Sequence, residues 1–288
     1  MTHHRLLAFD SGIGGLSVVR ELRALLPGIP IDYLADNAVF PYGELPDAVL
    51  IERVCMLVGA ALVRFRPDAV VVACNTASTV ALSGLRARFD VPFIGCVPPI
   101  KWAAEVSRTR TIGLLATSAT VRRPYLRDLQ SRFAPDCTLL AHGARGLADI
   151  AEAAFRHRAV DQAAIAHELD QLFGQDGGDR IDVVGIGCTH YSFLLDTLRE
   201  LSPAGITWLD PAAAVARRAQ FVLSTLALGL CMAAGPIDRG RAWFTGPAKD
   251  AERLLEGLAG FGYAEIMPFD VDAALPAATH HAAAPPAS

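Results

Sequence analysis

Several features that mark common protein classes are missing from this sequence. Its 288 residues include only two lysines, the formal net charge is −4, and no basic run is present. This charge argues against nucleic acid or an anionic membrane as the main partner. No uninterrupted apolar stretch of about 18 residues occurs, so we expect no membrane-spanning segment. The N-terminus reaches Asp10 after few apolar residues, so we expect no signal peptide and a cytoplasmic protein.

The cysteine pattern excludes two further kinds of protein. The six cysteines are scattered, with no Cys-x-x-Cys pair and no histidine at metal-ligand spacing. We therefore expect neither a zinc site nor a disulfide framework. A free cysteine is by default a small buried apolar residue, and we expect this of Cys55, Cys96 and Cys231. Cys74 and Cys188 differ because polar residues follow each of them directly, whereas Cys96 is followed by an apolar stretch without a polar partner.

What the sequence does contain is a regular alternation of strand-like and helix-like segments. Apolar runs rich in β-branched residues alternate with amphipathic segments, and the pattern restarts near residue 111. This rhythm predicts an α/β protein with two similar lobes, each a parallel sheet flanked by helices. We expect the active site in the cleft between the lobes, because ligands bind beyond the carboxyl ends of the strands. The expected strands span 5–10, 31–36, 69–74, 91–96, 111–117, 137–142, 181–188 and 206–210.

The same alternation indicates where the lobes begin and end. We expect lobe one to comprise residues 1–97 together with 211–270, and the second of these ranges to hold two more helices and a strand-like stretch at 242–246. Lobe two is expected to comprise residues 98–210. The remaining segment, 271–288, is rich in alanine and proline, and we expect a disordered tail there.

The two lobes resemble each other at one motif. Residues 71–78 read VVACNTAS and residues 183–192 read VVGIGCTHYS, so a buried strand twice ends at a cysteine with a threonine close behind. Ligands of open parallel sheets bind beyond the carboxyl ends of the strands. Facing lobes would then present Cys74 and Cys188 across one shared cleft, on opposite sides of a small molecule.

Five motifs, taken in order, carry a resemblance to a known family. They are FDSGIGG at 9–15, PYG at 41–43, ACNTAS at 73–78, VPPIK at 97–101 and GCTHY at 187–191. Together they resemble the glutamate racemases, which are cofactor-independent members of the aspartate/glutamate racemase superfamily. The glycine-rich motif lacks the Lys-Ser/Thr of a P-loop and the spacing of a dinucleotide fingerprint. His142 and Ser192 lie where the family usually has other residues.

The resemblance implies an isomerase that interconverts L- and D-glutamate without a metal or pyridoxal cofactor and supplies D-glutamate for peptidoglycan. Cys74 and Cys188 would be the catalytic pair, because racemisation needs a base on one face of the α-carbon and an acid on the other. Asp10 would assist Cys74, His190 would assist Cys188, and Glu152 would orient His190. The implied substrate-binding residues are Asp10, Ser11, Tyr42, Gly43, Asn75, Thr76, Thr189 and His190.

Other interpretations stay open. Racemisation of aspartate or of another acidic amino acid needs the same residue types. A hydrolase or decarboxylase of the same superfamily would use one cysteine, and the presence of both Cys74 and Cys188 counts against it. A non-catalytic binding protein would not need these cysteines together with Asp10 and His190. For Glu152 the alternative is a solvated helix carboxylate, and a homodimer is one candidate for the assembly.

Overall fold

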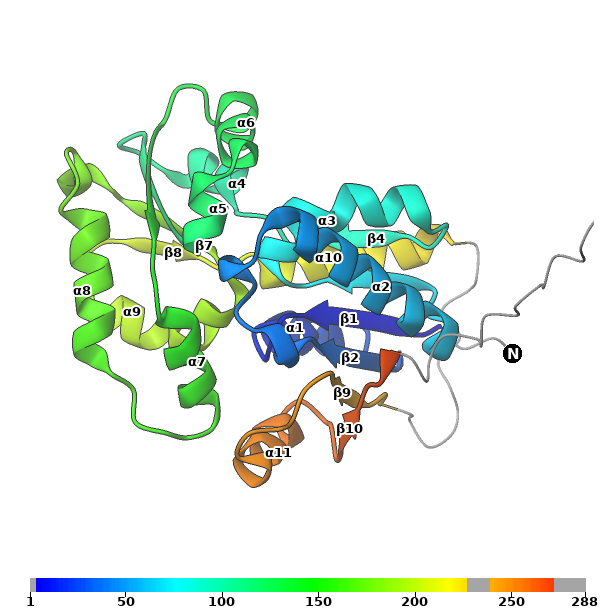
Figure 1. Ribbon diagram of the computed structural model, residues 1–288. Helices are drawn as coiled ribbons and strands as arrows, with labels where there is room; N and C mark the ends of the chain where they lie inside the picture. Colours follow the sequence, from blue (N-terminus) through cyan, green and yellow to red (C-terminus); the bar gives the residue numbers. More distant parts are fainter. Residues whose placement is uncertain (1–3, 227–238, 272–288) are drawn as a thin grey trace, which may run out of the picture.

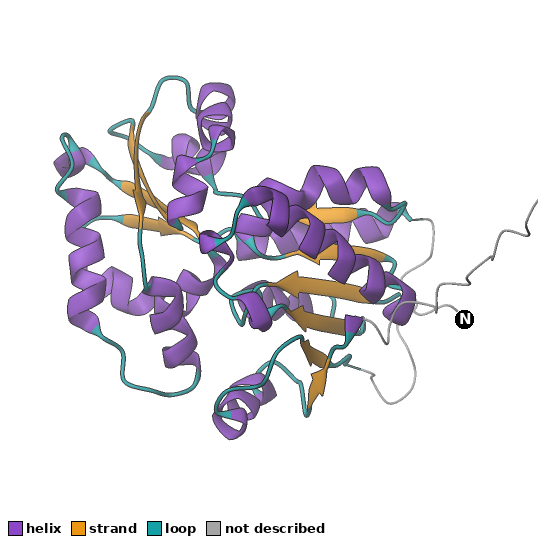
Figure 2. Ribbon diagram, in the orientation of Figure 1, coloured by secondary structure: helices purple, strands orange, loops and turns teal. Residues whose placement is uncertain are grey.

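Apolar strands from the two parts of the chain form two separate parallel sheets in the computed structural model, which describes residues 4–226 and 239–271. Each sheet is flanked by helices, and the two α/β units lie side by side (Figures 1 and 2). The predicted architecture of two parallel sheets flanked by helices is confirmed. Cys231 and the predicted tail, apart from Val271, lie outside the described residues.

The first sheet has six parallel strands in the order β10-β9-β2-β1-β3-β4. Strands β1, β2 and β3 are buried along their whole length, which explains their continuous apolar sequences. The edge strand β10 has no counterpart among the segments expected from the sequence. The strands are β1 (Leu6–Asp10), β2 (Ile31–Ala35), β3 (Ala69–Val72), β4 (Phe93–Gly95), β9 (Ala242–Phe244) and β10 (Ile266–Pro268).

The second sheet has four parallel strands in the order β6-β5-β7-β8. Its central strands β5 and β7 are fully buried, whereas the edge strand β6 is partly exposed. Across both sheets, each of the eight strands expected before residue 211 is present, with ends that differ by at most two residues. The strands of this sheet are β5 (Thr111–Ala116), β6 (Thr138–Gly143), β7 (Val183–Gly187) and β8 (Thr207–Leu209).

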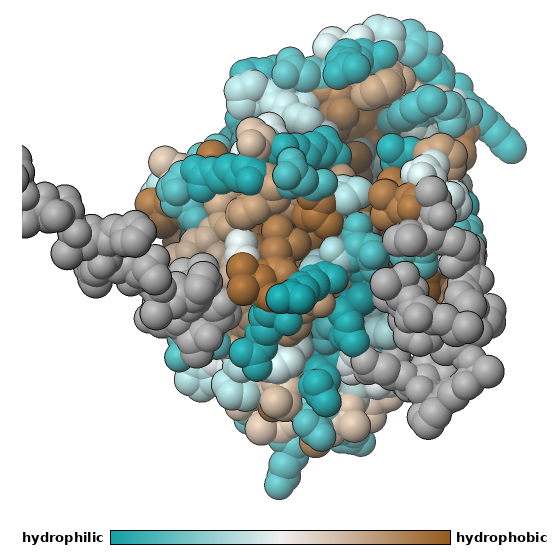
Figure 3. All heavy atoms as spheres, turned by 90° about the vertical axis from the view of Figure 1, so that its right-hand side faces the viewer, coloured by the Kyte–Doolittle hydropathy of each residue, from teal (hydrophilic) through white to brown (hydrophobic). Residues whose placement is uncertain are grey.

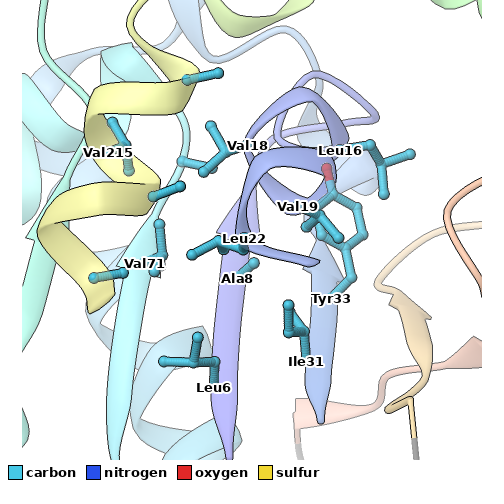
Figure 4. Close-up of a cluster of buried hydrophobic side chains, with 14 of the residues drawn as sticks. Leu6, Ala8, Leu16, Val18, Val19, Leu22, Ile31, Tyr33, Val71 and Val215 are labelled. Carbon is cyan, nitrogen blue, oxygen red and sulfur yellow. The ribbon is translucent and has the colours of Figure 1, made fainter. Parts of the chain in front are cut away.

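Helices cover both faces of the first sheet because successive strand residues point to opposite sides. Leu6 and Ala8 of β1 pack with α1 and α10, whereas Leu7 and Phe9 pack with α2 and α3. Figure 4 shows the first of these two cores. The helices of this unit are α1 (Leu16–Leu25), α2 (Asp47–Phe65), α3 (Asn75–Arg88), α10 (Ala212–Thr225) and α11 (Ala251–Ala259), with the 3-10 turns η1 (Asn37–Val39) and η2 (Tyr42–Glu44).

The second sheet is covered in the same way. Leu114 of β5 packs with α4 and α6, whereas the next residue, Leu115, packs with α7, α8 and α9. Helix α4, which begins inside the VPPIK motif, is not among the segments expected from the sequence. The helices of this unit are α4 (Ile100–Val106), α5 (Ser118–Arg122), α6 (Pro124–Phe133), α7 (Leu147–Phe155), α8 (Gln162–Phe173) and α9 (Leu195–Leu201), with the turns η3 (Gly178–Arg180) and η4 (Thr189–Leu194).

Some large apolar side chains lie at the surface. In the face that Figure 3 presents, apolar residues gather near the middle and hydrophilic residues surround them. Helix α2 exposes Val49, Met56 and Val63, each about half accessible to solvent. Within the part of the chain that the structure describes, no helix is both long and apolar enough to cross a membrane.

Candidate active site

Polar residues from the strand ends of both sheets meet between the two units. Asp10 is the last residue of β1, Cys74 follows β3 as the N-cap of α3, and Cys188 directly follows β7. A hydrogen bond from Thr189, which follows Cys188, to Asp10 joins the two sets. Because ligands of parallel sheets bind beyond these strand ends, the region is a candidate active site to which both units contribute.

Cys74 is held at the first turn of α3. Its sulfur accepts a hydrogen bond from the Ala77 N–H at 3.5 Å, and its thiol donates to Ser11 Oγ at 3.7 Å. Burial, followed by the negative charge of Asp10, raises the pKa of Cys74 to about 12, against the opposing effect of the Ala77 N–H. The Cys74 thiol is therefore protonated at neutral pH unless a positive charge comes next to it.

Cys188 is accompanied by a histidine and a glutamate. Cys188 Sγ lies 4.0 Å from His190 Nδ1, and His190 Nε2 lies 3.2 Å from Glu152 Oε1. Burial opposes a charge on His190, but the contacts with Cys188 and Glu152 and the charge of Asp10 raise the pKa of His190 well above its usual value. Burial likewise opposes a charge on Glu152, but His190 and Arg156 lower the pKa of Glu152 to about 2. A buried ion pair therefore lies beside the Cys188 thiol.

Glu152 connects the two units and is not a solvated carboxylate. It projects from α7, and its side chain is only 16% exposed. Its Oε1 accepts a hydrogen bond from the Ile13 N–H of the glycine-rich loop at 2.9 Å, and its Oε2 pairs with Arg156 at 2.5 Å. The contacts of Glu152 therefore tie the glycine-rich loop of one unit to His190 of the other.

The glycine-rich loop after β1 packs directly against this ion pair. A Cβ atom on Gly14 would lie 2.4 Å from His190 Nδ1, and one on Gly12 would lie 2.3 Å from Glu152 Oε1. The Tyr33 hydroxyl donates to the Gly12 carbonyl at 2.6 Å and anchors the loop from β2. Glycine is needed at these two positions because any larger side chain would displace the ion pair.

Asp10 joins the two units through its carboxylate. It is fully buried, and it accepts hydrogen bonds from the Gly12 N–H at 2.9 Å and from Thr189 Oγ1 at 3.1 Å. Burial raises the pKa of Asp10, although the charge of His190 and both hydrogen bonds act in the opposite direction. The Asp10 carboxylate thus influences the protonation of both Cys74 and His190.

Tyr42 and Gly43 begin the turn η2, at the same end of the first sheet. The Tyr42 hydroxyl donates its hydrogen bond to Asp36 Oδ2 at 2.7 Å and does not donate to a ligand in this arrangement. Gly43 faces the other unit, since a Cβ atom there would lie 3.5 Å from Thr117 Cβ. This turn can therefore offer a ligand its backbone N–H groups, while the Tyr42 hydroxyl is engaged elsewhere.

Thr117 lies in the site but is absent from the set predicted from the sequence. It directly follows β5 and caps α5, and its Oγ1 lies 3.3 Å from Thr76 Oγ1 of the other unit. Thr117 lies at the end of a buried central strand, as Asp10 does, and this position was a usable signal. The residues around it carry no distinctive chemistry, so the sequence alone did not mark it.

Cys96 is buried as expected, but the expectation that it lacks polar partners is wrong. Its thiol donates to Asn75 Oδ1 at 3.7 Å, its carbonyl accepts from Asn75 Nδ2 at 3.4 Å, and its N–H donates to Ser78 Oγ at 3.0 Å. These partners lie on α3, which packs beside β4. The Asn75 amide of the predicted binding set is therefore oriented by the end of β4.

Most of the predicted site residues are shielded from solvent, whereas Gly43 and Glu152 are partly exposed. Asp10, Ser11, Cys74, Cys188 and His190 are each at most 6% exposed. A cavity of about 470 Å³ between the units is lined in part by Glu152 and Phe40. The Phe40 ring lies against His190 with 5.1 Å between ring centroids. A substrate can reach the thiols only if the units or the side chains at their boundary move.

The chemistry available in the site is acid–base and nucleophilic. Within residues 4–226 and 239–271, no group of three or more His, Cys, Asp or Glu side chains could hold a metal ion. Two thiols from opposite units, each with its own ionisable neighbours, can remove a proton from one face of a carbon atom and supply one to the other.

Comparisons with known proteins agree with this chemistry. The model of the Asp/Glu/Hydantoin racemase family matches residues 17–219. A Granulibacter bethesdensis protein named glutamate racemase is 48% identical over 277 residues, which cover 95% of this chain and 99% of that protein. Escherichia coli glutamate racemase, solved with L-glutamate and the activator UDP-MurNAc-Ala, has a TM-score of 0.85 and 37% identity, covering 93% of this chain and 98% of that chain.

A further solved structure is similar over the same extent. Glutamate racemase from Thermus thermophilus, in complex with β-chloro-D-alanine, has a TM-score of 0.75 and 29% identity, covering 93% of this chain and 98% of that chain. The family match and the regions aligned with these relatives both include parts of the two units that form the site. This chain belongs to the Asp/Glu/Hydantoin racemase family, and a relative that is 48% identical to it over nearly the whole chain is named glutamate racemase.

Proposed function

We propose that this protein is a glutamate racemase that interconverts L- and D-glutamate by proton transfer, without a cofactor. The observation that carries the proposal is the presence of Cys74 and Cys188 on opposite units, with the buried Asp10 carboxylate acting on Cys74 through its charge and bonded to Thr189, the neighbour of Cys188. Identity of 48% to a protein named glutamate racemase, over nearly the whole chain, supports glutamate as the substrate.

The two thiols exchange roles in the two directions of the reaction. For L-glutamate, the Cys188 thiolate removes the α-proton and the Cys74 thiol supplies a proton to the opposite face. The product is D-glutamate, with Cys188 now a thiol and Cys74 a thiolate. Proton exchange through His190 and Asp10 restores the starting state, and D-glutamate reacts by the reverse sequence.

Substrate binding favours ionisation on the Cys74 side. With the pKa of Cys74 raised to about 12 by burial and by Asp10, a thiolate is disfavoured there. The α-ammonium group of glutamate brings a positive charge next to these two groups, which stabilises a thiolate. On the other side, the protonated His190 ring lies 4.0 Å from the Cys188 sulfur and is held by Glu152. The two thiols therefore exchange protons in different electrostatic surroundings.

The carboxylates and ammonium group of glutamate need several donors and acceptors. Hydroxyl groups, one amide and one carboxylate lie beside the thiols, and the η2 turn adds backbone N–H groups. Glycine at position 43 allows these N–H groups to approach an anion closely. We assign to substrate binding Asp10, Ser11, Tyr42, Gly43, Asn75, Thr76, Thr189 and His190, and we add Thr117.

Incubation of the purified protein with L-glutamate, followed by optical rotation, tests the proposal. Rotation should decay to zero, because the two enantiomers have equal free energy. If the optical rotation decayed with L-aspartate but not with L-glutamate, the aspartate alternative would be favoured. A new hydrolysis or decarboxylation product would favour a one-cysteine enzyme. Activity that is lost after dialysis against a chelator and restored by a metal would contradict a cofactor-free mechanism.

We further propose a cytoplasmic enzyme that supplies D-glutamate for peptidoglycan. We also propose two domains, the first comprising residues 1–97 with 211–270 and the second comprising residues 98–210. The sheet composition supports this division, since β5 to β8 fall within the second domain and the other strands within the first. A homodimer is supported by Val49, Met56 and Val63, whose spacing of seven residues places them on one side of α2. Sedimentation velocity of the wild type and of Met56→Glu tests the dimer.

A further inference from the structure

A second buried carboxylate, Asp36, lies behind the η2 turn of the proposed site. Asp36 follows β2 and exposes no surface. Its carboxylate accepts hydrogen bonds from Arg53 Nε and Nη2, both at 2.6 Å, from the Tyr42 hydroxyl at 2.7 Å and from Thr245 Oγ1 at 2.6 Å. Of these partners, Tyr42 alone belongs to the predicted site. The contacts join β2, α2 and the end of β9 to the turn.

Arg53 fixes the orientation of the Asp36 carboxylate. A bidentate pair of arginine and carboxylate holds both groups in one plane, which a lysine cannot do. Thr245 donates a second hydrogen bond to Asp36 Oδ1, and Tyr42 donates a second one to Asp36 Oδ2. The Asp36 N–H also donates to the Asp10 carbonyl at 2.8 Å. The carboxylate is therefore held both in its plane and relative to the end of β1.

Tyr42 connects this cluster with the backbone that faces the substrate. Hydrogen bonds within the turn are long, from the Glu44 N–H to the Pro41 carbonyl and from the Leu45 N–H to the Tyr42 carbonyl, both at 3.3 Å. The Tyr42 side chain is the better anchor, because Tyr42 is 1% exposed and its hydroxyl donates to the Asp36 carboxylate at 2.7 Å. A shift of the Asp36 carboxylate would therefore move the turn.

We propose that Arg53 and Thr245, acting through Asp36, are positioning residues that set where the Tyr42–Gly43 turn presents its backbone N–H groups to the substrate. This inference rests on the proposed racemase function. The turn takes no part in proton transfer, and we assign it to the non-reacting part of the substrate, so it contributes equally to the ground state and the transition state. Displacing it weakens substrate binding and leaves the proton transfers between the thiols intact.

Steady-state kinetics of Arg53→Met, measured in both directions, tests this role. KM for L- and for D-glutamate should rise about 10- to 100-fold, as expected when hydrogen bonds to a buried charge are lost, with kcat little changed. Arg88→Met is the matched control, because Arg88 also pairs with an acid of α2, Glu52, but at the surface. It should leave both constants within about twofold of wild type. Thr245→Val, which removes one neutral donor, should raise KM about threefold.

A double-mutant cycle identifies the route of the effect. If Arg53 acts through the Tyr42 hydroxyl, Arg53→Met should raise KM much less in a Tyr42→Phe background than in the wild type. The inference would be overturned if Arg53→Met raised KM by the same factor in both backgrounds. It would also be overturned if the folded Arg53→Met and Thr245→Val proteins lost kcat at unchanged KM. Wild-type protein that acts on aspartate and not on glutamate would contradict the proposed substrate only, and the same ratios would then be measured with aspartate.

Discussion

At the scale of single residues, the two thiols of the site differ in their surroundings. Cys74 caps a helix beside a hydroxyl and is under the influence of the Asp10 carboxylate, whereas Cys188 lies beside the ion pair of His190 and Glu152. A symmetric reaction is therefore carried out by an asymmetric site. The asymmetry means that the two cysteines can be distinguished experimentally.

Serine substitution separates the two proton transfers. A hydroxyl is a far poorer base than a thiolate, so Cys74→Ser and Cys188→Ser should each lower the racemisation rate about 10²- to 10⁴-fold. Elimination from β-chloroalanine needs only one proton removal. We expect Cys188→Ser to keep elimination from the D form and Cys74→Ser to keep it from the L form, as measured by pyruvate release. Elimination from the same enantiomer by both variants would contradict the pairing.

Removing the charge of Asp10 should change the acidity of Cys74. Because that charge raises the pKa of Cys74 and the Ser11 hydroxyl lowers it, Asp10→Asn should bring the pKa below about 12, and Ser11→Ala should move it upward. The rate of Cys74 alkylation by iodoacetamide as a function of pH, read by mass spectrometry of the Cys74 peptide, measures both shifts. Shifts in the same direction would mean that the electrostatic account of Cys74 is wrong.

At the scale of elements, the site is built from the segments that follow buried strands. The glycine-rich loop after β1, the η2 turn after β2 and the first turn of α3 after β3 lie side by side because their strands are neighbours in one parallel sheet. The glycine-rich loop also fills the space against His190 and Glu152. Its shape is therefore set by the other unit as much as by its own strand.

A single methyl group on this loop should disturb the site. In Gly14→Ala the new Cβ atom would lie 2.4 Å from His190 Nδ1, so the ring must move. We expect the racemisation rate to fall about 10²-fold, because small displacements of reacting groups have effects of this size. In Gly84→Ala of α3, the Cβ atom would make ordinary contacts at 3.7 Å. This control should keep full activity and raise the free energy of unfolding by up to about 1 kcal/mol.

Some helices and strands could be recognised from the sequence and others could not. The eight strands expected before residue 211 were recognisable because each is an apolar run with its own local pattern. β10, α4 and α5 were not recognised: β10 ends in Pro268, α4 directly follows Pro98 and Pro99, and α5 has only five residues. Short elements of this kind are stabilised by tertiary packing and not by local propensity.

At the scale of the whole molecule, the two units hold each other closed over the site. Arg123, at the start of α6, reaches across to Asp47 at 2.7 Å and to Thr79 at 3.3 Å. Near it, the two threonine hydroxyls of Thr76 and Thr117 meet. Since the thiols are nearly inaccessible in this arrangement, we expect these contacts to open when a substrate enters.

Loss of the Arg123 contacts should make the thiols more accessible. In Arg123→Ala, iodoacetamide should modify Cys74 and Cys188 up to about fivefold faster, the factor that corresponds to one partly exposed ion pair. Arg122→Ala is the control, because the side chain of Arg122 is exposed and adjacent in sequence. Peptide mapping by mass spectrometry measures the rates. Equal rates in both variants would show that the units do not open along this edge.

The sequence by itself determined the alternation of buried strands and helices and the chemical character of the strand ends, because both depend on residues that are close along the chain. It could not determine the partners of those residues. Thr189 meets Asp10 across 179 positions, Glu152 meets the Ile13 N–H across 139, and Thr245 meets Asp36 across 209. Only the packing of the two sheets and their flanking segments brings such distant residues within hydrogen-bonding distance, so these contacts were decided by the tertiary structure.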